Sequence, residues 1–237
     1  MRKLLLILTV SFLSLGAQAQ QTVIHDSNAE LRAVKGFHGI EVSSAINLYL
    51  SQGDSETVVV SASDIKWRDR IITEVEDGIL HIRLAGNHFS LGITKLKAYV
   101  SFTTLDHLDA SGASDIFVDG VITGDNLSVA LSGASDFRGA VNVKELKMNQ
   151  SGASDAHITG AVSGTATFES SGASDVKGFD LVTENCDVHA TGASDVRITV
   201  NKDLNADVSG ASSVHYKGNG AVRDLHSSGA SMVKKSS

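Results

Sequence analysis

Apolar and polar residues alternate with a period of two through the second half of the chain. In each alternating segment, apolar residues lie six, four and two positions before a glycine, as in Leu127, Val129 and Leu131. A second column of mostly β-branched residues lies four positions after each glycine: Ile116, Phe137, Ala156, Val176, Val196, Val214 and Val233. This alternation predicts strands that bury one face and expose the other.

Between these predicted strands lies a Gly-Ala-Ser motif that occurs seven times, at steps of 18 to 21 residues. The copies begin at Gly112, Gly133, Gly152, Gly172, Gly192, Gly210 and Gly229. A repeat this short cannot bury a core alone, so neighbouring copies must stack. The β-branched bias and the lack of a leucine-rich consensus favour strands over leucine-rich repeats. The sequence therefore predicts an all-β fold, a parallel β-helix with coils of about 18–21 residues.

The full pentad is Ser-Gly-Ala-Ser-Asp, and we expect it to form the corner between two strands of one coil. Glycine adopts positive φ without a steric penalty, alanine leaves room on the inside of a tight bend, and Ser and Asp hydrogen-bond their own backbone. Since each corner would lie over the one before it, identical residues are expected to form rows along the stack.

Residues 20–104 lack the pentad but keep strand-like alternation at 46–50, 57–60 and 79–84. We expect this part to be an irregular β-rich cap of the same solenoid and residues 105–237 to be its regular part, although a separate domain stays open. The local features that support this prediction are turns at Gly53-Asp54 and Asp77-Gly78, a degenerate corner at Ser43-Ser44-Ala45, and a short helix within 64–74 capped by Asp64.

Residues 1–19 have the pattern of a signal peptide, with Arg2 and Lys3 before an apolar run and Ala17-Gln18-Ala19 at the cleavage site. The mature chain would then begin at Gln20 and be exported to the periplasm, the cell surface or the medium. No other stretch approaches the roughly 20 apolar residues of a membrane span, so no transmembrane segment is predicted.

The charge balance narrows the range of partners. Without Arg2 and Lys3 the chain has 18 basic and 27 acidic residues, a net charge of −9, which disfavours nucleic acid and anionic membranes. Cys186 is the only cysteine, so no disulfide can form within one chain. It falls in an inward column, where a buried apolar role is expected.

Several segments together resemble the "putative auto-transporter adhesin, head GIN domain" family of exported bacterial proteins. They are 37–42 (FHGIEV), 45–54 (AINLYLSQGD) and 72–78 (ITEVEDG), followed by the pentad series. The chain departs from the pattern at Ala45, where the family often has glycine, and at Ser213 and Met232, which replace the pentad Asp. The resemblance implies an exported right-handed β-helix with an adhesin-type role, and it transfers no catalytic residues.

Two rows of charged residues are the candidate binding face. The acidic row is Asp115, Asp136, Asp155, Asp175 and Asp195, and two positions further on lie Arg138, His157, Lys177 and Arg197. Stacked carboxylates about 4.8 Å apart repel unless they are neutralised. We therefore expect the basic row to pair with the acidic row. The predicted ligand-binding residues are the five aspartates with Arg138, Lys177 and Arg197.

The acidic row has a second interpretation, a calcium ladder. Calcium-binding β-rolls place several acids in each glycine-rich turn, whereas this chain has one regular acid per coil. Turn capping balanced by the basic row is therefore favoured, and no metal or other cofactor is expected. The chain has no Gly-x-Ser-x-Gly elbow at the pentad serines and no His-Glu-x-x-His pattern, so no catalytic residues are assigned.

Three classes of function follow from this pattern. The favoured one is a non-enzymatic exported adhesin, or a cell-envelope binding or scaffold protein, whose partner is a glycan or an envelope or host protein. The second is a lyase or hydrolase that acts on polysaccharides, since parallel β-helices host such enzymes. The third is a purely structural unit that joins end to end. The oligomeric state stays open.

Overall fold

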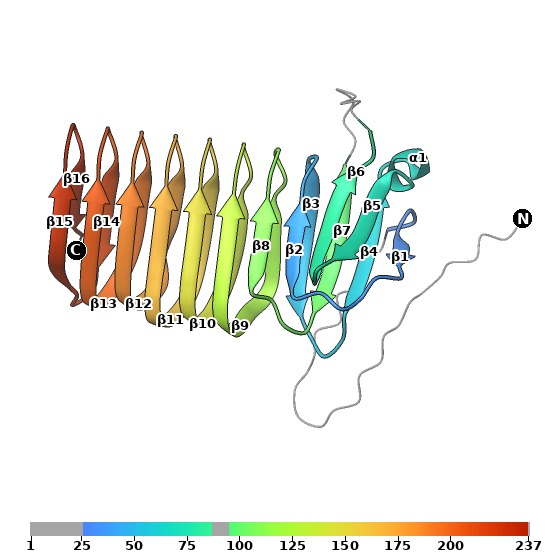
Figure 1. The fold of residues 1–237 in the computed structure, drawn as a ribbon, viewed down its shortest axis with the longest axis horizontal. Coiled ribbons are helices and arrows are strands. Elements are labelled where there is room, and N and C mark those ends of the chain that lie inside the picture. Colours follow the sequence, from blue (N-terminus) through green and yellow to red (C-terminus); the bar gives the residue numbers. More distant parts are fainter. Residues whose placement is uncertain (1–25, 87–94, 237) are drawn as a thin grey trace, which may run out of the picture.

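The computed structural model describes residues 26–86 and 95–236. The predicted signal peptide, 1–19, and the predicted mature N-terminus lie outside these ranges. Strands stack along one axis and form two sheets that face each other (Figure 1). The fold is an all-β parallel solenoid, as the repeat predicted.

Five long strands make the centre of the stack, and each crosses from one sheet to the other: β9 (Ile116–Leu131), β10 (Phe137–Gln150), β11 (Asp155–Ser170), β12 (Asp175–Ala190) and β13 (Asp195–Val208). Neighbouring strands pair parallel, with register shifts in mid-strand, such as the one between Val143 and Leu146. Their N-terminal halves form what we call the first sheet, and their C-terminal halves form the second sheet.

Short strands complete both sheets at the C-terminal end. They are β14 (Ser213–Lys217) and β16 (Met232–Lys235) in the first sheet and β15 (Ala221–Ser227) in the second. At the other end, β3 (Ile46–Gln52) continues the first sheet, and β2 (Gly39–Val42) and β8 (His107–Ala110) continue the second.

The predicted inward columns form the core between the two sheets. Leu127, Val129 and Leu131 are buried, and Phe137 and Phe168 are fully buried. Burial of one such side chain contributes roughly 1.5–3 kcal/mol. Cys186 lies in the same core and is fully buried, as expected. The stacking of small repeats therefore supplies the core that a single repeat lacks.

The prediction that the pentad alanine lies on the inside of the bend is wrong. The alanine of each pentad is exposed, and the following serine is the buried one: Ser114, Ser135, Ser154, Ser174, Ser194 and Ser212. Ser154 Oγ, for example, donates to the carbonyl of Ser151 at 3.0 Å. The serine is buried because its hydroxyl satisfies a carbonyl inside the bend, which an alanine methyl cannot do.

Backbone hydrogen bonds join each corner to the one before it. The Ala153 N–H donates to the Gly133 carbonyl at 2.8 Å, and Ala173 bonds to Gly152 in the same way. This pairing brings the glycines close together: a Cβ on Gly152 would lie 2.4 Å from the Gly133 oxygen, and φ there is +80°. Glycine is therefore required both by the local bend and by the neighbouring coil.

The degenerate corner at Ser43-Ser44-Ala45 is confirmed. Ser44 takes the place of the glycine with a φ of +69°, and the Ser111 N–H donates to the Val42 carbonyl at 3.0 Å. The Ile46 N–H donates to Ser114 Oγ of the next corner at 3.2 Å. The first pentad corner therefore stacks directly on this segment.

The N-terminal cap departs from the regular coils by antiparallel pairing. It contains β1 (Glu30–Arg32), β4 (Thr57–Ala62), β5 (Ile71–Glu76), β6 (Ile79–Leu84) and β7 (Leu96–Phe102). Asp77-Gly78 closes the β5–β6 hairpin, with positive φ at both residues, as predicted. Gly53-Asp54 joins β3 to β4, but these two strands do not pair because β7 lies between them.

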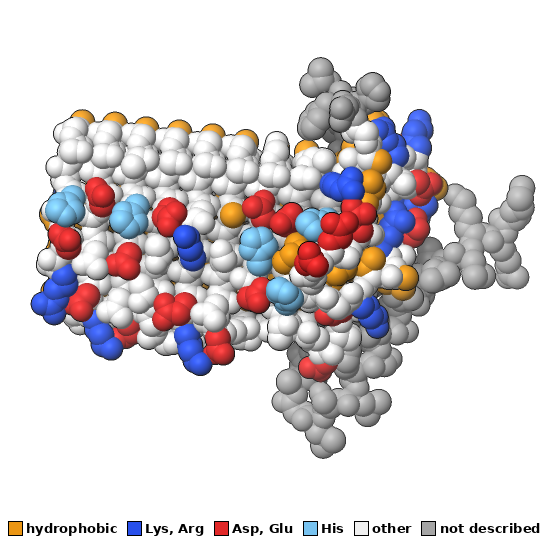
Figure 2. Space-filling model, viewed as in Figure 1, with side chains coloured by type: hydrophobic (Ala, Val, Ile, Leu, Met, Phe, Trp, Pro, Cys, Tyr) orange, Lys and Arg blue, Asp and Glu red, His pale blue; other side chains and the backbone are white. Residues whose placement is uncertain are grey.

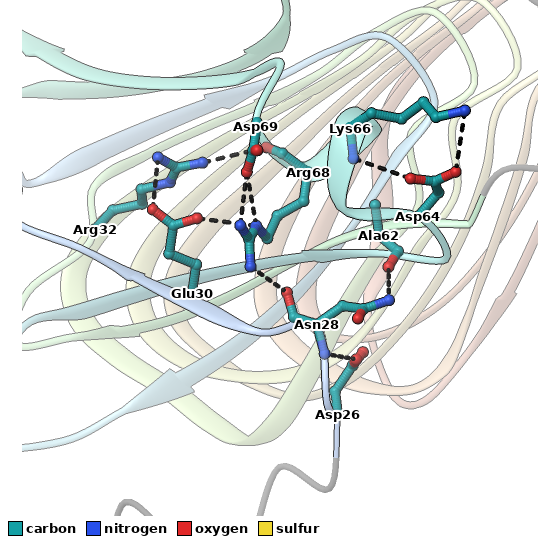
Figure 3. Close-up of polar contacts among 9 residues, drawn as sticks. All are labelled: Asp26, Asn28, Glu30, Arg32, Ala62, Asp64, Lys66, Arg68 and Asp69. Carbon is teal, nitrogen blue, oxygen red and sulfur yellow. Dashed lines mark hydrogen bonds and ion pairs between the residues drawn. The ribbon is translucent and has the colours of Figure 1, made fainter. Parts of the chain in front are cut away.

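The helix of the cap is shorter than the predicted range. It is α1 (Ile65–Arg68), a single turn, because the chain enters strand β5 at Ile71. Asp64 caps it as predicted, accepting from the Lys66 N–H at 3.0 Å. Figure 3 shows how Arg68 ties the helix to β1, through Glu30 at 2.9 Å and the Asn28 carbonyl at 3.4 Å.

No helix in the described part of the chain is long and apolar enough to cross a membrane.

We predict that Gly152→Ala lowers the free energy of unfolding by more than about 2 kcal/mol, since the new Cβ meets the Gly133 oxygen and φ is positive. The matched control is Gly124→Ala, where φ is not positive and no atom lies within 4 Å of the added Cβ. Urea or thermal unfolding measures both variants. Equal effects of the two substitutions would contradict the close-approach argument.

Candidate binding face

The acidic row lies on the outer surface of the first sheet. Strand register aligns Asp155 with Asp175 and Asp175 with Asp195. Two of these carboxylates accept hydrogen bonds from the backbone of the next coil, not from their own turn. The Asp136 N–H donates to Asp115 Oδ1 at 3.4 Å, and the Asp155 N–H donates to Asp136 Oδ1 at 3.3 Å. The row therefore links coils as well as lining the surface.

The basic row lies beside it in unbroken register: Arg138, His157, Lys177, Arg197, His215 and Lys234. Arg138 pairs with Asp136 at 3.4 Å and Lys177 with Asp155 of the preceding coil at 3.0 Å. Arg197 pairs with Asp195. Exposed pairs of this kind contribute about 0–1 kcal/mol each, but together they offset the repulsion within each row. We call the two rows together the charged ladder.

An aromatic stack continues the basic column toward the N-terminal cap. Tyr49 stacks on Tyr99 with ring centroids 5.0 Å apart and on Phe117 at 5.1 Å. The Arg138 guanidinium lies 5.8 Å from the Phe117 ring centroid, so the stack passes directly into the charged ladder. The ring faces contact one another, which leaves the ring edges for other contacts.

Sequence reasoning missed this stack because Tyr49 and Tyr99 lie outside the regular repeat. A signal was present for Tyr49, which lies five positions after Ser44, as Phe117 lies five positions after Gly112. Once Ser44 is aligned with Gly112, Tyr49 falls in the column of Phe117. The sequence gives no comparable signal for Tyr99, because β7 pairs with β3 and β4, which precede it in the chain.

A shallow depression lies within the charged ladder where β10, β11 and β12 run side by side. Its lining is Asp136, Phe137, Arg138, Asp155, His157 and Lys177. Two of the predicted binding aspartates, Asp136 and Asp155, therefore meet the predicted bases Arg138 and Lys177 at one place. His157 lies between the two bases in the register. Such a group offers donors for an anionic or hydroxyl group and carboxylates for a donor on the ligand.

The other predicted residues continue the ladder on either side of this depression. Asp175 and Asp195 follow Asp155 in register, and Arg197 follows Lys177. Asp115 lies at the end nearest the aromatic stack. Partial burial raises the pKa of Asp115 above its usual range, the Asp136 N–H lowers it, and the Asp136 carboxylate raises it further.

A second group of titratable side chains lies on the outer surface of the second sheet, near the cap. Glu41 contacts His81 at 3.0 Å and His107 at 3.9 Å. Burial raises the pKa of Asp109, and the charge of Glu41 raises it further. Figure 2 shows this surface, with acidic and histidine side chains gathered toward the cap. Sequence reasoning missed the group because its members come from three separate strands.

In the described part of the chain, several potential nucleophiles have structural roles, and the potential metal ligands form no group of three. In the ranges 26–86 and 95–236, no three His, Cys, Asp or Glu side chains are placed to hold a metal ion. The buried corner serines 135, 154, 174 and 194 donate to carbonyls, as in Ser174 to Ser171 at 2.9 Å. Burial raises the pKa of Cys186 well above its usual range, so this thiol stays protonated.

The protein is thus a parallel β-solenoid with a charged ladder on one sheet. The family model described as "Putative auto-transporter adhesin, head GIN domain" matches residues 36–220. The chain belongs to this family, as the resemblance indicated. No curated protein matches the sequence.

Solved structures share the fold at low sequence identity. A putative adhesin from Bacteroides fragilis NCTC 9343 is 20% identical with a TM-score of 0.82, covering 88% of this chain and 96% of the other. A putative adhesin from Parabacteroides distasonis ATCC 8503 is 22% identical with a TM-score of 0.67, covering 88% and 96%. A "putative lipid binding protein" from the same organism is 20% identical with a TM-score of 0.64, covering 89% and 98%.

We predict that Asp115→Asn raises the melting temperature at pH 7, by on the order of 1 °C. The folded-state pKa of Asp115 is raised, so the wild type loses stability as pH rises from about 3.9 through the folded pKa. Asparagine keeps an oxygen that can accept from the Asp136 N–H. Melting curves at pH 3 and pH 7 test this, and a variant less stable than wild type at pH 7 would contradict it.

We predict that calcium is not needed for stability, because the ladder carboxylates already bond to backbone N–H groups and basic side chains. EDTA should leave the melting temperature unchanged, and titration calorimetry should show no heat when calcium is added. A rise of the melting temperature with calcium that EDTA reverses would instead support a calcium ladder.

Proposed function

We propose that this protein is an exported, non-enzymatic binding protein of the adhesin type. Its charged ladder is the contact surface, and its partner is a glycan or a protein at the cell envelope or on a host surface. The observation that carries the proposal is the repetition of the same exposed acid–base pattern over consecutive coils of the first sheet.

Rigidity supports this role. The basic residues from Arg138 to His215 stand on strands that are hydrogen-bonded on both sides, as do Asp155, Asp175 and Asp195. Neighbouring charges there keep a spacing of about 4.8 Å. A partner with repeating polar groups can then make several weak contacts at once, and linked weak contacts bind far more tightly than any one of them. Surface exposure of Arg138, His157 and Lys177 leaves these groups accessible.

The chemistry of the ladder favours a partner rich in hydroxyl and charged groups. Basic side chains donate to carboxylates and sulfates, and the aspartates accept from hydroxyls and amines. The aromatic stack offers ring edges rather than open faces, so stacking of sugar rings on Tyr49, Tyr99 or Phe117 is not part of the proposal.

The polysaccharide-active enzyme is the weaker alternative. Such enzymes bind in long grooves, often walled by extended loops. Between the central strands of this solenoid the connections are short corners, such as 151–154 and 171–174, and the depression in the ladder is shallow. Export through the signal peptide at 1–19 belongs to the favoured proposal, and cell fractionation with surface protease shaving tests it.

We predict that replacing Asp136, Asp155 and Asp175 together with Asn weakens binding to cells or to a glycan array at least about tenfold, since each coil loses one contact. The matched control neutralises three acids of the second sheet: Glu169→Gln, Asp187→Asn and Asp207→Asn. Circular dichroism confirms that both variants fold. Binding that survives in the first variant would show that the ladder is not the contact surface.

A further inference from the structure

The two sheets of the solenoid end one strand apart at the C-terminal end. Beyond β13, the first sheet continues with β14 and β16, whereas the second sheet continues with β15 alone. In the described part of the chain, β16 pairs only with β14, and β15 pairs only with β13. Both strands therefore have an open edge, and the two edges form a step.

Apolar side chains of the core columns are exposed on the lower side of this step. Leu225 is in register with buried Ala206, and Val222 is in register with buried Leu204. Yet Leu225 is 47% exposed and Val222 is 36% exposed. These two side chains of β15 continue the core without a coil to cover them.

The acidic row stops before it reaches the step. Asp195 is its last member, and Ser213 and Met232 occupy the same outward position in the last two coils. Met232 is 45% exposed, where the coils before it have a carboxylate. The outer rim of the β16 edge thus has an apolar side chain in place of a charge that would oppose close contact.

We propose that this step joins two copies of the chain, with β16 of each copy paired antiparallel to β15 of the other. The two-fold axis lies parallel to the strands and passes between the two sheets. Second-sheet strands run toward the pentad corners and first-sheet strands run away from them (Figure 1). After the rotation, β16 and β15 of the copy are therefore antiparallel neighbours.

The step is complementary to itself about this axis. The rotation exchanges the two sheets, so the longer first sheet of one copy meets the shorter second sheet of the other. Each β16 then fills the place above β15 of the copy, and both sheets continue from one copy into the next. The pentad corners of both copies stay on the same side, so the narrow and wide edges of the coils also match.

Alternation along the strands limits the register. Opposed residues lie on the same face of a sheet, so inward Val233 must lie opposite inward Leu225 or inward Ser227 of the copy. With Leu225, an apolar pair closes the core and Lys234 lies opposite Asp224 on the outer surface. With Ser227, Lys234 would lie opposite a histidine instead. The first register therefore joins apolar to apolar inside and base to acid outside.

The paired segment is short, 232–234 of one copy with 224–226 of the other. It ends at Arg223, where β15 departs from the register of β13. Lys235 lies beyond this point, and its ammonium lies 5.9 Å from the centroid of the Tyr216 ring of its own chain. Because each interface has two such segments and no long strand, we expect a dimer that dissociates on dilution.

The assembly closes at two copies, because the two-fold interface uses both open edges at this end of each copy. The caps then lie at the two far ends, and the exchange of sheets places one charged ladder on each side of the dimer. The pairing does not rest on the proposed function. Self-association is measured without any ligand, so its failure would leave the proposed function as it stands.

Cysteine cross-linking tests the register. Opposed residues of an antiparallel pair have Cβ atoms about 4.5–5.5 Å apart, so an equal mixture of Asp224→Cys and Lys234→Cys should give a covalent dimer on mild oxidation. Each variant alone should not, because the rotation places identical positions on opposite sides of the dimer. Buried Cys186 does not compete. A covalent dimer only from a mixture of His226→Cys and Lys234→Cys would overturn the proposed register.

Light scattering over a range of concentrations tests the dimer itself. The wild type should pass from monomer to dimer and stop there. Lys234→Asp should raise the dissociation constant about tenfold or more, since two Lys–Asp pairs become Asp–Asp pairs. Adding Asp224→Lys to that variant should restore the dimer, because the charges are then exchanged.

Lys35→Asp, at an exposed position of the cap, is the matched control and should leave the dissociation constant unchanged. Thermal unfolding checks that every variant folds. A wild type that stays monomeric at its highest soluble concentration, or that grows into longer oligomers, would overturn the proposal. So would a charge exchange that fails to restore the dimer.

Discussion

Hydrogen bonding between successive coils limits which residue types the regular part of the solenoid can contain. In the regular coils, most residues have a counterpart in the next coil about 4.8 Å away. A residue type can therefore repeat there only if two of its side chains fit side by side. Gly152 shows this most clearly, since any side chain there would collide with the Gly133 carbonyl. Buried Ser154 shows the polar version, because its hydroxyl satisfies a carbonyl within the bend. The pentad is therefore conserved along the stack for reasons of geometry.

The outer surface of the first sheet obeys the same constraint. Aspartates in register would repel, and pairs such as Lys177 with Asp155 of the preceding coil offset that repulsion. Toward the cap, the column of the basic row contains uncharged aromatic residues instead, and Tyr49 stacks on Tyr99 and Phe117. The regular spacing of this polar face thus results from the stacking of the coils. The proposed binding role depends on the same paired charges that stacking requires.

The two ends of the stack differ because only one of them is closed. At the cap, antiparallel strands, α1 and the contacts of Arg68 with Glu30 and Asn28 complete the sheets. At β15 the core columns of Val222 and Leu225 end in exposed side chains. The two ends of the solenoid therefore close the core differently, and the charged ladder lies between them.

The strands, the inward columns, the corners and the two charged rows can be predicted from the sequence, since a repeat of about twenty residues shows which residues become neighbours. Three features become visible only in the folded chain: the burial of the corner serine, the insertion of β7 between β3 and β4, and the contacts of Glu41 with His81 and His107. The physical reason is that pairing between coils is non-local. Where the chain repeats, one coil predicts the next; in the cap, strands pair out of chain order, and only their packing shows which side chains meet.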